Sequence, residues 1–177
     1  MSTLQKILNW SPLLSVRRNH ALEHATLHLL AQKQPQLRLA GYSDREGFWV
    51  AGEVSSDLLA ATANEALERL RKGEAGLAIH PNCGTNFVVS GAAAGGLAWL
   101  ATASAGSGFK KKFDRLPWAV LLATFGLILA QPLGPLAQKW ITTAADPGQL
   151  AVSEVSYYPR NGMPYHRVRT RLAARAE

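Results

Sequence analysis

The stretch FVVSGAAAGGLAWLATASAGSGF, Phe87–Phe109, carries no charged residue within a chain of 177 residues. A second stretch, LPWAVLLATFGLILAQPLGPLAQ over Leu116–Gln138, also lacks charged residues. A helix rises about 1.5 Å per residue, so each stretch is long enough to cross the roughly 30 Å hydrocarbon core of a bilayer. The sequence therefore predicts a transmembrane hairpin over residues 87–138, with spans at 87–108 and 116–138.

The segments on either side of the hairpin show the periodicities of a small folded domain. Apolar spacing predicts helices at Val16–Lys33 and Asp57–Arg71, and strands at Leu37–Tyr42, Phe48–Val54, Leu77–His80, Val152–Tyr158 and Tyr165–Thr170. Two spans return the chain to its starting side, so we expect the C-terminal β-hairpin (residues 149–171) to join the sheet of the domain at residues 16–86. The predicted fold class is α+β, a small α/β domain of two helices and short antiparallel strands attached to a two-helix transmembrane hairpin.

Residues 1–15 are interpreted as an interfacial amphipathic segment. Leu4, Ile7 and Leu8 recur near helical spacing, with Trp10 among them. This pattern is typical of a short helix that lies on the membrane surface. A helix packed on the domain core has the same spacing, so the sequence leaves both arrangements open.

The formal net charge of +7 is dispersed along the chain. Residues 1–85 are nearly balanced in charge, and the excess lies in the loop between the spans and in the C-terminal tail, at Arg160, Arg167, Arg169, Arg171 and Arg175. Contact with anionic lipid headgroups explains positive charge beside a membrane more simply than nucleic acid does. We therefore expect the lipid bilayer as a partner and no nucleic acid.

The first span is rich in small residues, with Gly91 and Gly95 spaced as GxxxG. A small face allows two membrane helices to approach closely. The second span is the expected partner of this face, and a second copy of the chain in a homodimer is the alternative. The second span should kink or end early at residues 131–135, which contain two prolines.

The first predicted helix contains residues suited to metal chemistry. His20, Glu23 and His24 form an H-x-x-E-H pattern whose side chains occupy an arc of about 100° on one helix face. Two imidazoles one turn apart can bind one ion, and the adjacent carboxylate can ligate the ion or hydrogen-bond its water. This is the spacing of inverzincin peptidases. His28 is interpreted as a neighbour of the site or an exposed residue, and His166 as an ordinary surface histidine.

A second motif, His80-Pro81-Asn82-Cys83-Gly84-Thr85, stands directly before the first span. Cys83 is the single cysteine, which excludes an intramolecular disulfide. Imidazole and thiolate are the preferred ligands of zinc. The sequence therefore predicts a transition-metal site, most simply zinc, with the ligands His20, His24, His80 and Cys83. The alternative is that these residues have ordinary structural roles in the core and on the surface.

The pairing of H-x-x-E-H-x-T at residues 20–26 with H-P-x-C-G-T at residues 80–85, before a membrane span, resembles the YqhQ family of bacterial membrane proteins. Members of that family are described as predicted metal-dependent enzymes. The chain also resembles a smaller uncharacterised family of two-span membrane proteins that share both motifs. The resemblance implies an integral protein of the bacterial inner membrane whose site is formed by His20, Glu23, His24, His80 and Cys83. It implies no particular reaction, and this chain is shorter than the YqhQ proteins.

Two functions follow from a metal site. With four protein ligands the site is closed and structural, and the protein is then an accessory or scaffold component of a membrane complex, with other membrane subunits or a second copy as partners. The alternative is a membrane-surface, peptidase-like metal-dependent hydrolase in which Glu23 takes a proton from metal-bound water. In that case His20, His24 and either Cys83 or His80 hold the ion and leave one position for water. Glu65 or Glu68 could replace Cys83 or His80 as the third ligand.

The sequence gives opposing signals on orientation. The basic loop at residues 110–115 favours a cytoplasmic loop by the positive-inside rule. The domain at residues 16–86 follows no cleavable signal sequence, which favours a domain that stays in the cytoplasm. We expect the soluble domain on the cytoplasmic side.

Overall fold

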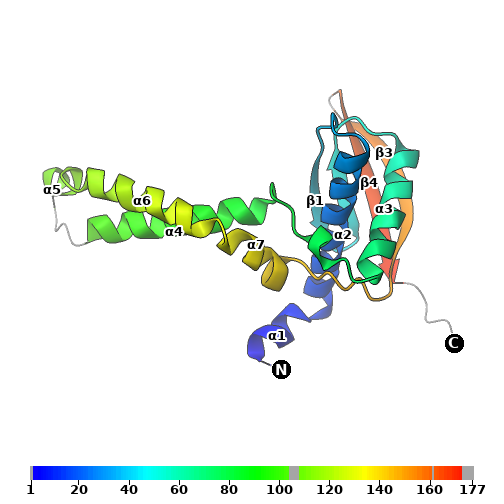
Figure 1. Cartoon of the computed structure of the whole chain (residues 1–177), viewed down its shortest axis with the longest axis horizontal. Helices are drawn as coiled ribbons and strands as arrows, with labels where there is room; N and C mark the ends of the chain where they lie inside the picture. The colour runs from blue at the N-terminus through cyan, green and yellow to red at the C-terminus, as the bar shows by residue number, and fades with distance from the viewer. Residues whose placement is uncertain (1, 104–107, 161, 173–177) are drawn as a thin grey trace. The chain divides into compact units, whose positions relative to one another are not determined.

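The structure is a computed structural model that describes residues 2–103, 108–160 and 162–172. The chain forms two compact units, Met1–His80 together with Lys139–Glu177, and Pro81–Gln138. The first unit contains a four-stranded sheet, and the second consists of helices (Figure 1). The fold is therefore α+β, as the sequence predicts.

The sheet of the first unit is antiparallel, with the strand order β1-β2-β4-β3. Its strands are β1 (Ala40–Asp44), β2 (Gly47–Ala51), β3 (Leu150–Arg160) and β4 (Met163–Leu172). The two hairpins meet where β2 pairs with β4, and Trp49 lies opposite Arg167 there. Segments from both ends of the chain therefore share one sheet, although the whole second unit separates them in sequence.

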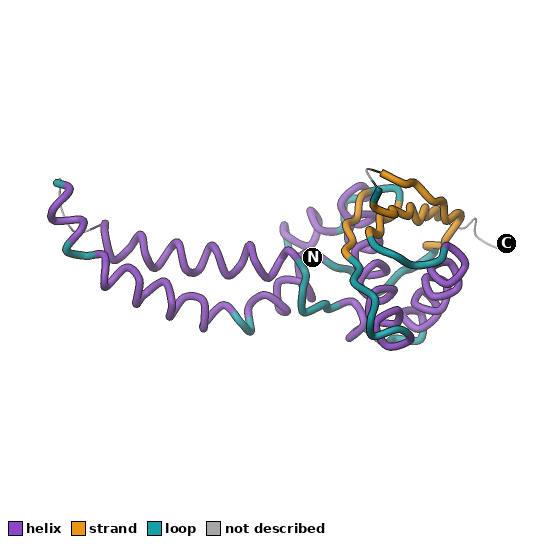
Figure 2. Tube along the Cα trace, turned by 90° about the horizontal axis from the view of Figure 1, so that it is seen from above, coloured by secondary structure: helices purple, strands orange, loops and turns teal. Residues whose placement is uncertain are grey.

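Two helices cover one face of this sheet, α2 (Ser11–Lys33) and α3 (Ser56–Arg71) (Figure 2). Ser55 caps α3 by accepting a hydrogen bond from the amide of Leu58. Apolar side chains of both helices meet alternate residues of the central strands, because successive strand residues point to opposite faces. Fully buried members of this core include Leu22, Leu30, Phe48, Val50, Leu59 and Val168. The core fixes the orientation of α2, which carries the H-x-x-E-H residues.

The turn between β1 and β2 depends on Gly47. Its φ of 143° lies in the region that favours glycine. A Cβ at this position would clash with the carbonyl oxygen of Val168 on β4. Any larger residue would push β2 away from β4, so the pairing that joins the two hairpins requires glycine at this position.

The second unit is a helical hairpin. α4 (Gly84–Ala103) packs along α6 (Leu116–Ala130) and α7 (Leu133–Ala137), and the short α5 (Phe109–Phe113) lies between α4 and α6 in sequence. α7 runs into a π-helix, η2 (Gln138–Thr142), which makes Leu116–Thr142 a helical stretch of 27 residues. α4, with 20 residues, and this stretch are both long and apolar enough to cross a membrane. The helix is interrupted at Gln131 and Pro132, inside the segment where the sequence predicts a kink.

The small face of α4 does not pack on the second apolar helix, and that sequence expectation is wrong. A Cβ built on Gly91, Gly95 or Gly96 would have no atom of the described chain within 4 Å. The close approach lies on the other side of α4, where a Cβ on Gly126 would be 2.8 Å from the carbonyl oxygen of Ala93. The glycine that allows the two helices to meet therefore belongs to α6.

Other boundaries also differ from the sequence expectations. The first helical segment breaks at Asn9–Trp10 into α1 (Thr3–Leu8) and α2, because Pro12 occupies the first turn of α2. Leu77–His80 does not form a strand, since Ala75–Ala78 folds into a 3-10 helix, η1. Residues 104–107, at the expected end of the first span, and Arg175 of the basic tail lie outside the described residues.

Candidate metal centre

Four histidines of the first unit form one cluster. The ring centroids of His20 and His24 lie 4.2 Å apart on α2. The His80 ring lies 5.5 Å from that of His24 and 4.7 Å from that of His28. A ring nitrogen of His20 and one of His24 lie within 4.8 Å of each other, so a small rotation lets both bind one ion at about 2 Å. The pair could hold a metal.

Backbone carbonyls set the tautomers of the two α2 histidines, His20 and His24. Nδ1 of His24 lies 2.7 Å from the carbonyl oxygen of Ala78, and Nδ1 of His20 lies 3.0 Å from that of Thr142. A carbonyl can only accept, so Nδ1 carries the proton in both rings and Nε2 holds the lone pair of the neutral imidazole. Metal-binding histidines are commonly oriented in this way, with one nitrogen donating to a carbonyl and the other available to the ion.

The 3-10 helix η1 brings His80 to the cluster. Its last carbonyl accepts from His24, and the next carbonyl, of Ile79, accepts from Nε2 of His28 at 2.7 Å. These two bonds hold the chain against α2 immediately before His80. Burial, reinforced by the charges of His28 and His24, lowers the pKa of His80 to about 4. The His80 ring is therefore neutral at pH 7, the state in which imidazole binds a metal.

Glu23 is almost fully buried, with 4% of its surface exposed. Its Oε2 accepts a hydrogen bond from the Ser43 hydroxyl at 2.5 Å. A Cβ on Gly41 would lie 2.6 Å from Oε1, so the carboxylate is in close contact with the backbone of β1. Glu23 thus links α2 to the edge strand of the sheet.

Cys83 belongs to the second unit and follows His80 by three residues. Its Sγ accepts from the amide of Thr85 at 3.4 Å, at the start of α4. Three residues span at most about 10 Å. The chain itself therefore limits the distance between Cys83 and His80.

The end of η2 and the residue after it are held on α2 by polar contacts. Arg17, which is 8% exposed, donates to the carbonyls of Trp140 and Thr143 at 3.3 and 2.8 Å. The carbonyl of Thr142 between them accepts from His20. Helix C-termini leave carbonyls without intrahelical partners, and here Arg17 and His20 supply the donors. Burial lowers the pKa of Arg17, which still remains charged at neutral pH.

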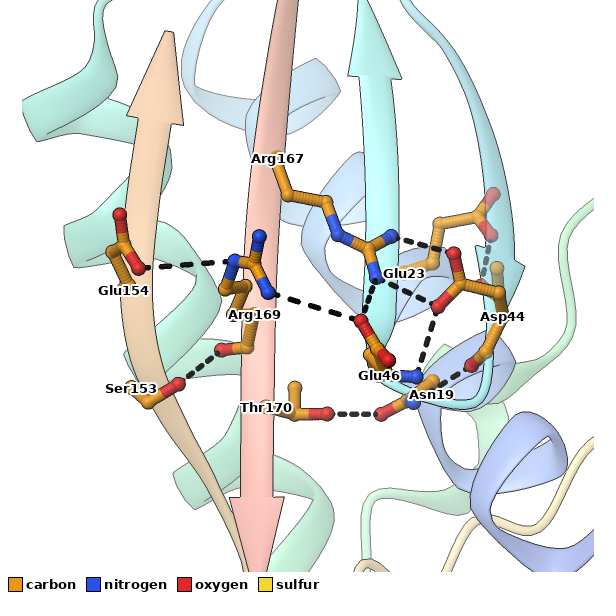
Figure 3. Close-up of polar contacts among 10 residues, drawn as sticks. Asn19, Glu23, Asp44, Glu46, Ser153, Glu154, Arg167, Arg169 and Thr170 are labelled. Atoms are coloured by element: carbon orange, nitrogen blue, oxygen red, sulfur yellow. Dashed lines mark hydrogen bonds and ion pairs between the residues drawn. The ribbon is translucent and has the colours of Figure 1, made fainter. Parts of the chain in front are cut away.

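A polar network ties α2 to the end of β1 and to β4 (Figure 3). Asn19, which is fully buried, donates to the carbonyl of Asp44 at 2.8 Å and accepts from the Thr170 hydroxyl at 2.8 Å. Arg167 binds the Asp44 carboxylate with two bonds of 2.8 and 2.7 Å. Arg167 is only 4% exposed, so it is not available to lipid headgroups as the sequence suggested for the tail arginines.

His166 is also not the surface residue that the sequence suggested. It is 2% exposed, because it lies on the central strand β4 and points toward the helices. Its Nδ1 lies 3.3 Å from the Ser56 hydroxyl, and burial lowers its pKa. The alternation of residues along β4 could have predicted this burial. Residues two apart in a strand share a face, and Val168 is fully buried.

Sequence reasoning missed the groups that hold Glu23 and the two α2 histidines. These groups are the Ser43 hydroxyl and the carbonyls of Ala78 and Thr142, which are common chemical groups with no motif of their own. The sequence contains one indication for Ala78. It stands two residues before His80, so it must lie near any site that contains His80. Thr142 could not be found from the sequence, because it lies 122 positions after His20 in the chain.

Comparisons with known proteins give a family. The family model described as "Domain of unknown function (DUF6391)" matches residues 15–155, most of the chain. An uncharacterized protein of Picosynechococcus sp. is 37% identical over 173 residues, which cover 90% of this chain and 80% of the relative. No solved structure matches the chain. The chain belongs to the DUF6391 family.

Proposed function

We propose that this member of the DUF6391 family is an integral membrane protein with a structural transition-metal site, most simply zinc, and that it serves as an accessory or scaffold component of a membrane complex. The ligands in this proposal are His20, His24, His80 and Cys83. The observation that carries it is the pair of α2 histidines, whose ring centroids lie 4.2 Å apart and whose Nδ1 atoms are each bonded to a backbone carbonyl.

The chemistry of the donor set supports a closed site. Three imidazoles and a thiolate give four protein ligands, the number that completes a tetrahedral zinc site and leaves no position for water. His80 lies beside His24, and Cys83 follows it closely enough for its thiolate to reach the same ion. One ion bound by these residues would link α2 to the residues that precede the first apolar helix. This link would hold the domain at the membrane.

Two features support the membrane part of the proposal. Two helices of the described chain are long and apolar enough to span a bilayer. In α1 and the residues after it, Leu4, Ile7 and Trp10 are all more than half exposed, as expected of an amphipathic segment lying on a membrane. We place the protein in the bacterial inner membrane, with the soluble domain on the cytoplasmic side.

The contacts of Glu23 favour the structural role over a hydrolase. A general base must reach the proton that it abstracts. The Glu23 carboxylate accepts from Ser43 and lies against Gly41, contacts that join α2 to β1 and support a structural role. A membrane-surface hydrolase is therefore the second choice. A substitution of Glu23 can distinguish the two functions.

The metal content of the purified full-length protein tests the proposal. We expect about one zinc ion per chain, lost in His24→Ala and in Cys83→Ser. Because a site assembled from separate segments stabilises only the folded state, chelation should lower the melting temperature of the parent and leave that of both variants unchanged. His166→Asn, which changes a buried histidine outside the cluster, should keep its metal.

Glu23→Gln is the discriminating variant. It should retain the metal, with a modest loss of stability from the altered bond to Ser43. Parent protein without bound metal after metal-supplemented purification, or metal retained in both His24→Ala and Cys83→Ser, would contradict the site. A peptidase activity of the parent that Glu23→Gln abolishes at full metal content would establish the hydrolase instead.

A further inference from the structure

A pocket of about 320 Å³ lies on the sheet of the first unit, lined by Tyr42, Trp49, Tyr158, Pro159, Arg160 and Tyr165. The strand register places its aromatic residues on one face, because Tyr42 pairs with Trp49 and Tyr158 with Tyr165. The core residues Phe48 and Val50 alternate with Trp49 and point the other way, toward α2 and α3. The pocket therefore lies on the face of the sheet opposite α2 and α3. Figure 2 shows the helices of this unit on one side of its strands.

The rings in this pocket suit a flat ligand. The centroids of Trp49 and Tyr158 lie 5.5 Å apart, with their planes inclined by 58°. A planar ring can stack on one of them while its edge meets the other, which are the two favoured aromatic arrangements. Tyr42 is 60% exposed and Tyr158 43%, so both have accessible surface to offer.

Arg167 on β4 contacts the ring of Trp49 and holds it in place. The guanidinium carbon of Arg167 lies 5.1 Å from the centre of the indole. Arg167 is itself fixed by its two bonds to Asp44, which also balance its charge. A fixed ring loses little conformational entropy when a ligand stacks on it. The aromatic platform is therefore organised before any ligand binds.

The positive charge in the pocket indicates that the ligand also carries an anionic group. Arg160 is the one charged residue among the six that line it, and its side chain is exposed. Lining of this kind favours an anion, and a guanidinium is well suited to binding the oxygens of a phosphate. From ring and charge together, we propose that this pocket binds a small ligand that joins a flat heterocycle to a phosphate, the chemistry of a nucleoside monophosphate.

Titration of the full-length protein in detergent micelles with AMP, followed by calorimetry, tests this proposal. AMP should bind, and adenosine and inorganic phosphate should each bind at least about tenfold more weakly, because each keeps only half of the contacts. Trp49→Ala should weaken AMP binding by about tenfold or more. Arg160→Glu should weaken AMP strongly and adenosine little.

Tyr157→Ala is the matched control. Tyr157 is the neighbour of Tyr158, points to the opposite face beside His166, and is 54% exposed, so its loss should leave AMP binding unchanged. Tyr158→Leu gives a second, surface-exposed test of the ring contacts if Trp49→Ala is poorly folded. Chelated protein should bind AMP as well as the metal-loaded protein does, which separates this pocket from the proposed metal site.

Several results would overturn the pocket proposal. AMP could fail to bind at millimolar concentration, or bind equally well to Trp49→Ala and Tyr158→Leu. Choline could bind in preference to AMP, which would make the pocket a cation cage. Binding confined to an oligoadenylate or to anionic lipid vesicles would show that the face takes a macromolecular partner instead.

Discussion

At the scale of single residues, the pair of Asp44 and Arg167 shows how one buried charge is accommodated. Arg167 is 4% exposed and the Asp44 side chain is 40% exposed, so only the carboxylate keeps good access to water. Burial opposes the ionisation of Asp44, but hydrogen bonds from Arg167 and from the amides of Glu46 and Gly47 outweigh it and lower the pKa of the carboxyl. The pair holds β1 to β4 across β2.

The lowered pKa of Asp44 predicts an acid-sensitive contribution to stability. A carboxyl whose folded-state pKa lies below its unfolded value of about 4 stabilises the fold above that pH, and the contribution disappears as the pH falls through the folded-state pKa. Asp44→Asn should therefore lower the free energy of unfolding at pH 7 by about 1–2 kcal/mol. This estimate is smaller than for a fully buried pair because solvent screens Asp44.

Denaturant unfolding at pH 7 and at pH 3 measures this effect. The difference between Asp44→Asn and the parent should narrow at the lower pH. Glu74→Gln, which removes a carboxylate of lowered pKa from an exposed pair with Arg69, serves as a control and should have the smaller effect at pH 7. A difference between Asp44→Asn and the parent that is independent of pH would show that the charge of Asp44 does not matter.

At the scale of elements, the hairpin of the second unit depends on the contact between α4 and α6. A Cβ on Gly126 would lie 2.8 Å from the carbonyl oxygen of Ala93 and 2.9 Å from Cα of Ala94. Both contacts are to backbone, which cannot move aside as a flexible side chain can. The helices approach this closely only because α6 has a glycine at the crossing.

Gly126→Leu should therefore separate α4 from α6 and destabilise the hairpin by about 1–3 kcal/mol, the usual cost of overpacking. Gly91→Leu is the matched control, because a Cβ there meets no described atom within 4 Å. Unfolding in mixed micelles with increasing denaturing detergent compares the two variants. Equal effects of the two substitutions would contradict this account of the contact, and a large effect of Gly91→Leu alone would favour a second copy of the chain on the outer face of α4.

At the scale of the whole molecule, the sheet contains strands from before and after the hairpin, since β2 pairs with β4. If both apolar helices cross the membrane, the two ends of the chain must lie on the same side. We predict that single cysteines introduced at Ser2 and Arg171 are labelled from one side of the membrane and one at Lys111 from the other.

Labelling of intact cells and of inverted vesicles with a membrane-impermeant thiol reagent measures this topology. The Cys83→Ser parent is the control for background labelling, because Cys83 is the single native cysteine. Ser2 and Arg171 accessible from opposite sides would contradict the two-span arrangement. Labelling of all three positions from one side would contradict any crossing at all.

The sequence by itself determined the elements whose physical cause is local. Charge-free stretches predicted the two apolar helices, and the 3.6-residue period predicted a helix ending at Lys33 and another ending at Arg71. The i, i+4 spacing of His20 and His24 predicted their meeting, because helix geometry alone brings them together.

Only the tertiary structure decided which elements meet. It placed the small face of α4 outward, buried His166, and directed Glu23 toward Ser43 on β1. It also supplied the carbonyls of Ala78 and Thr142, which orient His24 and His20. The physical reason is that packing and backbone hydrogen bonds between distant segments depend on the whole core, and backbone groups are the same at every position in the sequence.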